Sequence, residues 1–360
     1  MGSLIAAPAA PAAWVLDAAE PAWFPRSMQP SGDRARALVL GATGHIGQAM
    51  VRELLAHGYH VTAVTRRTSP ANLAGLDVDL AVGDADAPGQ IDAWARGHDV
   101  IVDAAAPYPI HRFAPQSSAE RDPLRYAATR MRVVLDAAFR SDARLVYIGS
   151  FTTLPRGDAR LAALETSFRR QSHPYFAVKA HMEGMVLDAA RHGLPVVLAN
   201  PTAFLGPWDD KPAELALVPQ LLAGLVPATV RRIVNIVDVR DAAAAIRGAL
   251  EAEAFGAPLP ITGHDVPTDV LAARICELAG VRPPLLRASA RLSATGAFWM
   301  EAALSLGGRP SPLPSLALLL VLDAYAMGAP IATMRFGEGV RPLDETLRDA
   351  IAWYRSQRRA

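Results

Sequence analysis

One stretch near the N-terminus limits the possible folds of this chain more than any other. Residues 37–40 (ALVL) form a short apolar run typical of a buried parallel strand, and GATGHIG follows it with three glycines, Gly41, Gly44 and Gly47. Residues 48–57 then carry apolar side chains on one helical face, and residues 59–65 alternate apolar and polar side chains. The pattern predicts a strand, a tight turn, a helix and a second strand.

A turn of this kind is typical of dinucleotide-binding proteins. Glycines let the backbone turn sharply and approach a pyrophosphate, while exposed N–H groups and the helix dipole stabilise its charge. The triplet is informative because it stands between a strand and a helix. His45 is expected to present its backbone to the phosphate rather than to react. The residues expected to bind the cofactor here are Gly41, Thr43, Gly44, His45, Ile46 and Gly47.

The end of the second predicted strand indicates which dinucleotide is bound. An acidic residue at this place would bind the 2′-hydroxyl of the adenosine ribose. The chain instead has Thr65-Arg66-Arg67, without a carboxylate. Arginine offers a planar fork of donors that suits a phosphate. We therefore predict that Arg66 and Arg67 favour NADP(H) over NAD(H).

Four further apolar runs predict strands, with helical stretches between them. The strands are expected at 80–84, 100–104, 145–148 and 196–199, and the clearest helices at 123–140 and 175–191. Alternation of strands and helices predicts an α/β fold with a doubly wound parallel sheet of the Rossmann type. We assign residues 36–203 mainly to this domain and residues 204–360 mainly to a smaller substrate-binding lobe. Residues 233–250 are expected to return to the first domain.

Composition and charge make several classes of protein implausible. The 360 residues carry a net charge of +1, which gives no reason to expect nucleic acid as a partner. The single cysteine, Cys276, cannot form an intrachain disulfide, which fits a cytoplasmic location. The sequence has no apolar run long enough to cross a membrane and no metal-ligand cluster. Residues 1–35 are rich in alanine and proline and are expected to form a loosely ordered extension without a signal-peptide pattern.

A tyrosine and a lysine on the predicted helix 175–191 form a second motif. Tyr175 and Lys179 are four residues apart, in a chain with seven tyrosines and only two lysines, so the spacing is rarely met by chance. This spacing places both side chains on one helical face. An ammonium beside a phenol favours the phenolate and so lowers the pKa of the tyrosine. Tyr175 is therefore a candidate proton donor and acceptor.

Further motifs follow one another in an order that points to a known family. They are GDADAP (83–88), YIGSFTTLP (147–155), YFAVK (175–179), NPTAFLGPWD (200–209), IVDVRD (236–241) and RPLDETLRDAIAWYR (341–355). With the glycine turn, they resemble the extended short-chain dehydrogenase/reductases from about residue 36 to the C-terminus. The sequence is most similar to the dihydroflavonol reductase and 3β-hydroxysteroid dehydrogenase branch of the NAD-dependent epimerase/dehydratase family.

The resemblance implies roles for individual residues. Tyr175 would protonate a carbonyl while NADPH delivers hydride, Lys179 would hold the nicotinamide ribose, and Ser150 would polarise the substrate oxygen, with Thr152 as the alternative for that role. A homodimer formed through helices 123–140 and 175–191 is compatible with the resemblance. The further cofactor contacts that it implies are Asp84, Ala85, Ala104, Ala105, Ala106, Pro201 and Thr202.

The sequence also departs from the family pattern. Many members carry an asparagine on the helix after the fourth strand, but residues 125–131 contain none. Val178 replaces a common serine, and Gly149 replaces a common hydroxyl residue. Ala203 stands where nucleotide-sugar enzymes usually have asparagine, and residues 151–152 lack the carboxylic acid of the dehydratases. The departures at Ala203 and at residues 151–152, with the missing acidic residue after the second predicted strand, argue against a sugar nucleotide as substrate.

The leading interpretation is an NADPH-dependent reductase of a carbonyl or enone-like group on a bulky apolar molecule, such as one of secondary metabolism. It rests on the apolar segments 107–116 and 292–327. One alternative is an epimerase or dehydratase that acts on a sugar or sugar nucleotide and retains NAD. Another is a non-catalytic NAD(P)-binding sensor, although such proteins usually lose the tyrosine or the lysine. The expected substrate contacts are Tyr108, Thr152, Phe204 and Trp208.

Overall fold

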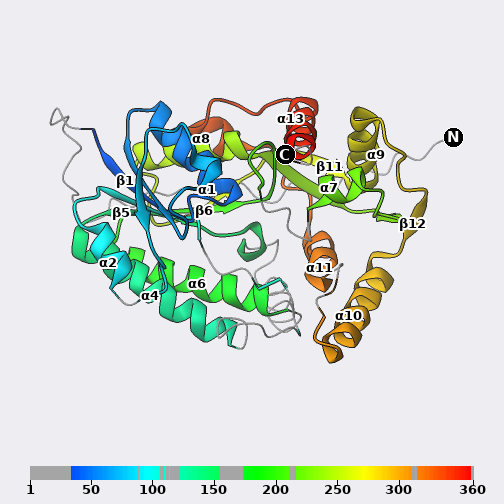
Figure 1. The fold of residues 1–360 in the computed structure, drawn as a ribbon, viewed down its shortest axis with the longest axis horizontal. Coiled ribbons are helices and arrows are strands. Elements are labelled where there is room, and N and C mark those ends of the chain that lie inside the picture. Colours follow the sequence, from blue (N-terminus) through cyan, green and yellow to red (C-terminus); the bar gives the residue numbers. More distant parts are fainter. Residues whose placement is uncertain are drawn as a thin grey trace.

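The structure is a computed structural model, and it has two layered parts (Figure 1). It describes residues 34–87, 89–105, 109–110, 113, 122–154, 173–210, 216–309, 311 and 314–357. Residues 1–33 of the predicted extension, Ala106, Tyr108 and most of the segment 107–116 lie outside the described residues.

A seven-stranded parallel sheet forms the centre of the larger part. The strand order is β10-β6-β5-β4-β1-β2-β3, and every neighbouring pair is parallel. After β1 the chain builds β2 and β3 on one side and then crosses to β4 on the other, so the ends of β1 and β4 flank a crevice suited to a ligand. The predicted Rossmann-type fold is confirmed. The strands are β1 (Arg36–Leu40), β2 (His60–Thr65), β3 (Asp79–Val82), β4 (Val100–Asp103), β5 (Arg144–Ile148), β6 (Val196–Pro201) and β10 (Pro258–Ile261).

Helices cover both faces of this sheet because successive strand residues point to opposite sides. Val39 packs in a core with α1 (His45–Ala56) and α8 (Val239–Glu251). Leu38 and Leu40 pack in a second core with α4 (Pro123–Ser141) and α6 (Pro174–Arg191). The short helices α2 (Gln90–Ala95) and α12 (Ile331–Phe336) extend these two layers, next to α4 and α8 respectively.

The start of α6 positions the tyrosine–lysine motif. The Nδ1 atom of His173 accepts a hydrogen bond from the backbone N–H of Tyr175 at 3.2 Å, and Pro174 occupies the first helical position. Both features are typical of helix N-termini, where backbone N–H groups lack helical partners. Tyr175 therefore lies in the first turn of α6 and Lys179 in the second.

The smaller part is built mainly from the C-terminal half of the chain. Its three-stranded sheet has the order β11-β9-β7, and β8 and β12 form a separate parallel pair. A third core joins α7, α9 and α13. The chain returns to the larger part through α8, which packs on α1, and through β10. The strands are β7 (Ala203–Leu205), β8 (Ala228–Val230), β9 (Ile233–Asp238), β11 (His264–Pro267) and β12 (Leu286–Ala288), and the helices are α7 (Leu217–Leu222), α9 (Thr268–Ala279), α10 (Ala290–Leu306), α11 (Ser315–Asp323) and α13 (Leu343–Gln357).

Candidate active site

The glycine turn between β1 and α1 leaves no room for side chains. Gly41 has a φ of +76°, and a Cβ atom added to it would lie 2.8 Å from the carbonyl oxygen of Ala104. A Cβ atom at Gly47 would lie 2.0 Å from the carbonyl oxygen of Gly41. No side chain caps the N-terminus of α1 at Gly44, so this helix end suits an anion. The turn thus fits the pyrophosphate of a dinucleotide.

The residues predicted for the adenosine end lie after β2, β3 and β4. The backbone N–H of Gly83 donates to the carbonyl oxygen of Thr65 at 3.0 Å, which holds the ends of β2 and β3 together. Arg66, Arg67 and Asp84 are exposed there. The guanidinium groups of Arg66 and Arg67 are thus open to solvent at the end of β2.

The predicted catalytic residues meet at the ends of β5 and α6. The Tyr175 hydroxyl donates to Ser150 Oγ at 3.0 Å, and the Thr152 hydroxyl donates to the same oxygen at 3.0 Å. The Lys179 Nζ atom donates to the carbonyl oxygens of Ile148 and Gly149 at 3.4 and 3.3 Å. Ser150, Tyr175 and Lys179 are nearly buried and all line one cavity, whereas Thr152 lies behind Ser150 and outside the lining.

Burial sets the protonation of this group. It raises the pKa of Tyr175 to about 12, although the hydrogen bonds to Ser150 and Thr152 act in the opposite direction. Burial also lowers the pKa of Lys179 to about 8, against the opposing effect of the Asp103 and Glu183 carboxylates. The pKa of Tyr175 is therefore raised and not lowered as expected, because desolvation of the buried phenolate dominates.

A buried charged network beside Lys179 was not predicted from the sequence. The Arg130 guanidinium on α4 donates two hydrogen bonds to Asp103 at the end of β4, and both side chains are buried. Glu183, one turn beyond Lys179, accepts from Asn200 Nδ2 at 2.7 Å, and burial raises its pKa. The four-residue spacing from Lys179 to Glu183 was the one sequence signal for this network.

A segment after β7 packs on the glycine-turn helix. The carbonyl oxygen of Pro207 lies 3.0 Å from His45 Nε2, and that of Trp208 accepts from Gln48 Nε2 at 2.8 Å. The Arg52 guanidinium lies over the Trp208 ring, 4.6 Å from its centroid. The structure therefore places Trp208, predicted as a substrate contact, against α1 and outside the cavity wall, and gives His45 a side-chain contact in addition to its expected backbone role.

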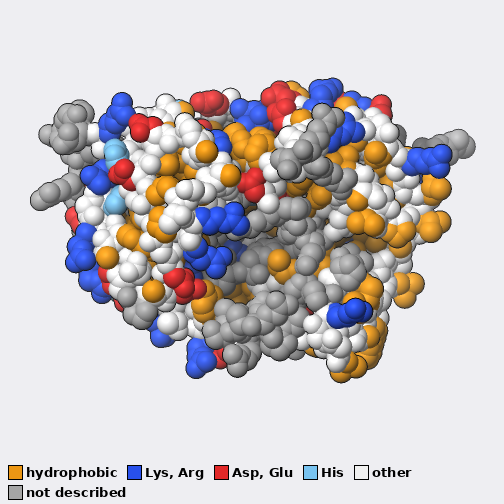
Figure 2. All heavy atoms as spheres, viewed as in Figure 1, with side chains coloured by type: hydrophobic (Ala, Val, Ile, Leu, Met, Phe, Trp, Pro, Cys, Tyr) orange, Lys and Arg blue, Asp and Glu red, His pale blue; other side chains and the backbone are white. Residues whose placement is uncertain are grey.

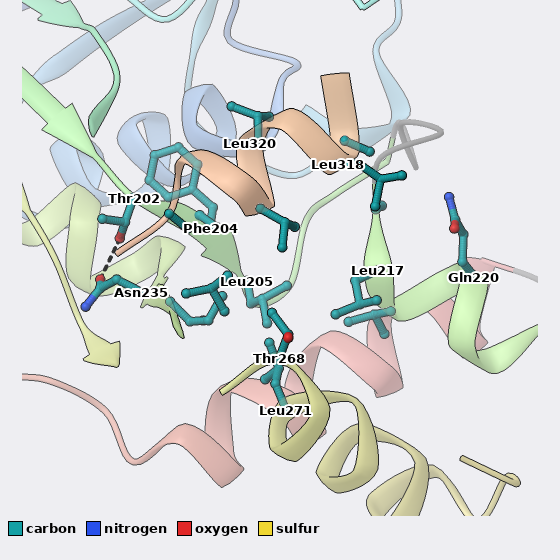
Figure 3. A pocket seen from close by; sticks show the side chains of 18 of the residues that line it. Thr202, Phe204, Leu205, Leu217, Gln220, Asn235, Thr268, Leu271, Leu318 and Leu320 are labelled. Atoms are coloured by element: carbon teal, nitrogen blue, oxygen red, sulfur yellow. Dashed lines mark hydrogen bonds between the residues drawn. The ribbon is translucent and has the colours of Figure 1, made fainter. Parts of the chain in front are cut away.

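A cavity of about 1430 Å³ extends from the catalytic residues into the smaller part. Pro201, Thr202 and Phe204, all predicted site residues, line it near Tyr175. Farther out, side chains from α7, α9 and α11 surround it (Figure 3). These include Leu217, Leu271 and Leu318. The wall also contains polar side chains, among them Gln220, Asn235 and Thr268, and the Thr202 hydroxyl donates to Asn235 Oδ1 at 2.8 Å.

Comparison with known proteins agrees with this geometry. The profile of the NAD dependent epimerase/dehydratase family matches residues 37–259. The chain therefore belongs to that family, and it is an NAD(P)-dependent oxidoreductase of the extended short-chain dehydrogenase/reductase type.

The names of individual relatives refer to different activities. A Synechocystis protein assigned by name to the dihydroflavonol 4-reductases is 28% identical over 88% of this chain and 94% of its own length. The sterol demethylase protein B of Methylococcus capsulatus is 30% identical over 71% of this chain and 78% of its own. The solved structure of PA4631, a nucleoside-diphosphate-sugar epimerase from Pseudomonas aeruginosa, has a TM-score of 0.70 at 21% identity and covers 90% of this chain and 99% of its own. The last match shows the shared fold.

The described part of the chain contains no helix with the length and apolar character needed to span a bilayer.

Proposed function

We propose that this protein uses NADPH to reduce a carbonyl or enone-like group on a bulky apolar small molecule. The observation that carries the proposal is that the hydrogen-bonded pair Ser150 and Tyr175 lines the same cavity as the apolar walls of α7, α9 and α11. A ketone inside this cavity could direct its oxygen at the two hydroxyls while its apolar body lies against leucine side chains.

The chain's own residues would bind and protonate the substrate oxygen. NADPH, when bound along the glycine turn, supplies the hydride. Tyr175 donates the proton, and with a pKa of about 12 its hydroxyl keeps that proton at neutral pH. Ser150 donates a second hydrogen bond to the oxygen, since Thr152 donates to the serine and leaves the serine's own hydrogen for the substrate. The Tyr175 hydroxyl, which donates to Ser150 in this structure, would turn to the substrate oxygen to deliver its proton. Lys179 would bind the nicotinamide ribose, with Pro201 and Thr202 beside the nicotinamide amide.

Three finer parts of the proposal each have their own support. The preference for NADPH is supported by exposed Arg66 and Arg67 after β2. The homodimer is supported by the family resemblance, which assigns to the interface α4 and α6, two helices that pack on each other within the chain. The apolar substrate is supported by the names of two relatives, which refer to a dihydroflavonol and to a sterol.

A nicotinamide absorbance assay tests the proposal. Wild-type protein should oxidise NADPH with at least one ketone from a panel of steroids and dihydroflavonols, and Tyr175→Phe should not. UDP-sugars should produce no turnover. Activity on a sugar nucleotide with NAD that stays bound through purification would instead identify an epimerase or dehydratase, the alternative that the family match supports. Cofactor binding without turnover of any ketone or sugar would identify a sensor.

A further inference from the structure

The outer side of α10 carries a row of large apolar side chains. Leu292, Trp299 and Leu306 are 75%, 66% and 92% exposed. They are spaced by seven residues, so they lie along one side of the helix. Gly296 and Ala303, between them on the same side, are also exposed and uncharged. A solvated helix face normally carries polar side chains, so this apolar stripe indicates a binding surface.

The stripe continues on the neighbouring strand and reaches the cavity. Leu285 and Leu286, just before α10, are 90% and 64% exposed. Leu286 pairs with Ala228 of β8, and the residues from Leu225 to Val230 line the cavity. Leu225 is itself 70% exposed while lining the cavity, so it marks a mouth. The outer apolar surface and the inner apolar wall therefore meet at β8 and β12.

The exposed charges of this segment are basic, and one of them, Arg287, is paired with Asp269 of α9, with 3.4 Å between Arg287 Nη2 and Asp269 Oδ2. Among the described side chains between residues 281 and 331, the exposed ionic ones are Arg282, Arg287 and Arg309. The two carboxylates of the same segment, Glu301 and Asp323, are buried, and Glu301 accepts a hydrogen bond from the Ser315 hydroxyl at 2.6 Å. Figure 2 shows hydrophobic side chains with a basic group over α10 at the lower right of the molecule. Arginines beside apolar groups suit a surface of phosphate head groups over acyl chains.

We propose that α10 and β12 dock this protein on the surface of an anionic lipid bilayer. The stripe of Leu292, Trp299 and Leu306 enters the boundary between head groups and acyl chains, and Arg282 and Arg309 contact lipid phosphates. The helix lies in the plane of the membrane and does not cross it. Docking brings the mouth at Leu225 to the bilayer, which gives an apolar substrate a dry route to the cavity. Only this last consequence rests on the proposed function.

Vesicle flotation of the full-length chain tests the proposal. Wild-type protein should float with vesicles of phosphatidylcholine and phosphatidylglycerol, and less with phosphatidylcholine alone or at high salt. The triple variant Leu292→Ser, Trp299→Ser, Leu306→Ser should lose at least tenfold in partitioning. Ile331→Ser with Met334→Ser is the matched control, because these side chains are 68% and 62% exposed on α12, which packs on α8. Circular dichroism spectra like that of the wild type are required to show that both variants fold.

A second measurement identifies the group that enters the lipid. Brominated acyl chains should quench part of the tryptophan fluorescence of the wild type, and Trp299→Phe should remove that part. Equal flotation of the triple variant and the wild type overturns the proposal. The proposal is also overturned if the wild type does not float with vesicles and forms a dimer that the triple variant does not form. The stripe would then bind a second copy of the chain. Tyr175→Phe should still float, so a failed reductase assay and a failed docking assay are distinguishable.

Discussion

Arg130 of α4 and Asp103 at the end of β4 form a buried, two-pronged ion pair, with Nη2 2.6 Å from Oδ1 and Nη1 2.9 Å from Oδ2. Arg130 belongs to the stretch 125–131, where the family resemblance leads one to expect an asparagine. Burial lowers the pKa of Arg130, but the Asp103 carboxylate more than offsets this effect and keeps the group charged. Arg130 thus holds Asp103, and with it the end of β4, beside Lys179.

Removal of one member of this pair should be costly. Arg130→Met leaves the Asp103 carboxylate buried without its partner, and we expect the free energy of unfolding to fall by about 3–5 kcal/mol. The double variant Arg130→Met, Asp103→Leu removes both charges and should recover most of that loss. Urea unfolding measures both values. If Arg130→Met were as stable as the wild type, water or another group would have to stabilise the buried Asp103 carboxylate in place of Arg130.

Loss of the Tyr175 hydroxyl should remove turnover and leave the cofactor site intact. We expect Tyr175→Phe to lower kcat by about 10²–10⁴, because a positioned proton donor contributes that much. Ser150→Ala should lower kcat by about 10²–10³, the usual loss for one donor to a developing oxyanion. Thr152→Val should cost less than Ser150→Ala, since Thr152 lies outside the cavity lining and would act on the substrate oxygen through its hydrogen bond to the serine. Steady-state kinetics with an NADPH-binding titration checks all three, and a Tyr175→Phe enzyme with normal kcat would contradict the assignment.

Burial of Lys179 should appear in the pH dependence of stability. Its pKa is lowered by burial to about 8, from an ordinary value of 10.5. Below about pH 8 the amine is protonated in both states, so the cost of burying the charge is fully present. As the pH rises from about 8 toward 10, the amine loses its proton in the folded protein before it does so in the unfolded chain. The unfolded chain then binds more protons than the folded protein, so the free energy of unfolding rises with pH.

Lys179→Met removes this dependence and is the variant to compare. It should be more stable than the wild type below about pH 8 by up to roughly 3 kcal/mol, and the gap should narrow toward pH 10. The measurements stop at pH 10 because burial raises the pKa of Tyr175 to about 12. Above about pH 10 the tyrosine loses its proton more readily in the unfolded chain, which lowers the free energy of unfolding. A gap that stays constant with pH would show that Lys179 keeps its ordinary pKa in the folded protein.

The sequence predicted the elements whose periodicity is local and missed those that depend on tertiary contacts. Six strands of the large sheet follow from apolar runs, but β10 (PLPI) has four residues, two of them prolines, which argue against a strand. Its prolines are tolerated because β10 is an edge strand. Asp103, Arg130 and Glu183 come from three elements, so only folding brings their charges together. Trp208 was expected in the substrate pocket because it is apolar, but Arg52 binds its ring.

The two arginines after β2 should determine cofactor choice. Arg66→Ala and Arg67→Ala should each raise the KM for NADPH about tenfold or more, since a charged hydrogen bond to phosphate is worth about 1.5–3 kcal/mol. The KM for NADH should change little, because NADH has no 2′-phosphate. Arg96→Ala, which removes an exposed arginine after α2, is the control. Equal losses with both cofactors would show that the arginines do not read the ribose phosphate.

Two glycine-to-alanine substitutions should have opposite effects, because one glycine is in close backbone contact and the other is in an ordinary exposed helix position. At Gly47 the new Cβ atom would lie 2.0 Å from the carbonyl oxygen of Gly41, so the turn must open and NADPH binding should weaken by at least tenfold. At Gly184, exposed on α6, no atom lies within 4 Å of the added Cβ, and alanine should stabilise the helix by about 1 kcal/mol. A titration of NADPH fluorescence and thermal unfolding measure the two effects. Normal NADPH affinity in Gly47→Ala would show that the dinucleotide does not need the tight turn, because the same substitution cannot be accommodated without moving the Gly41 carbonyl away from α1.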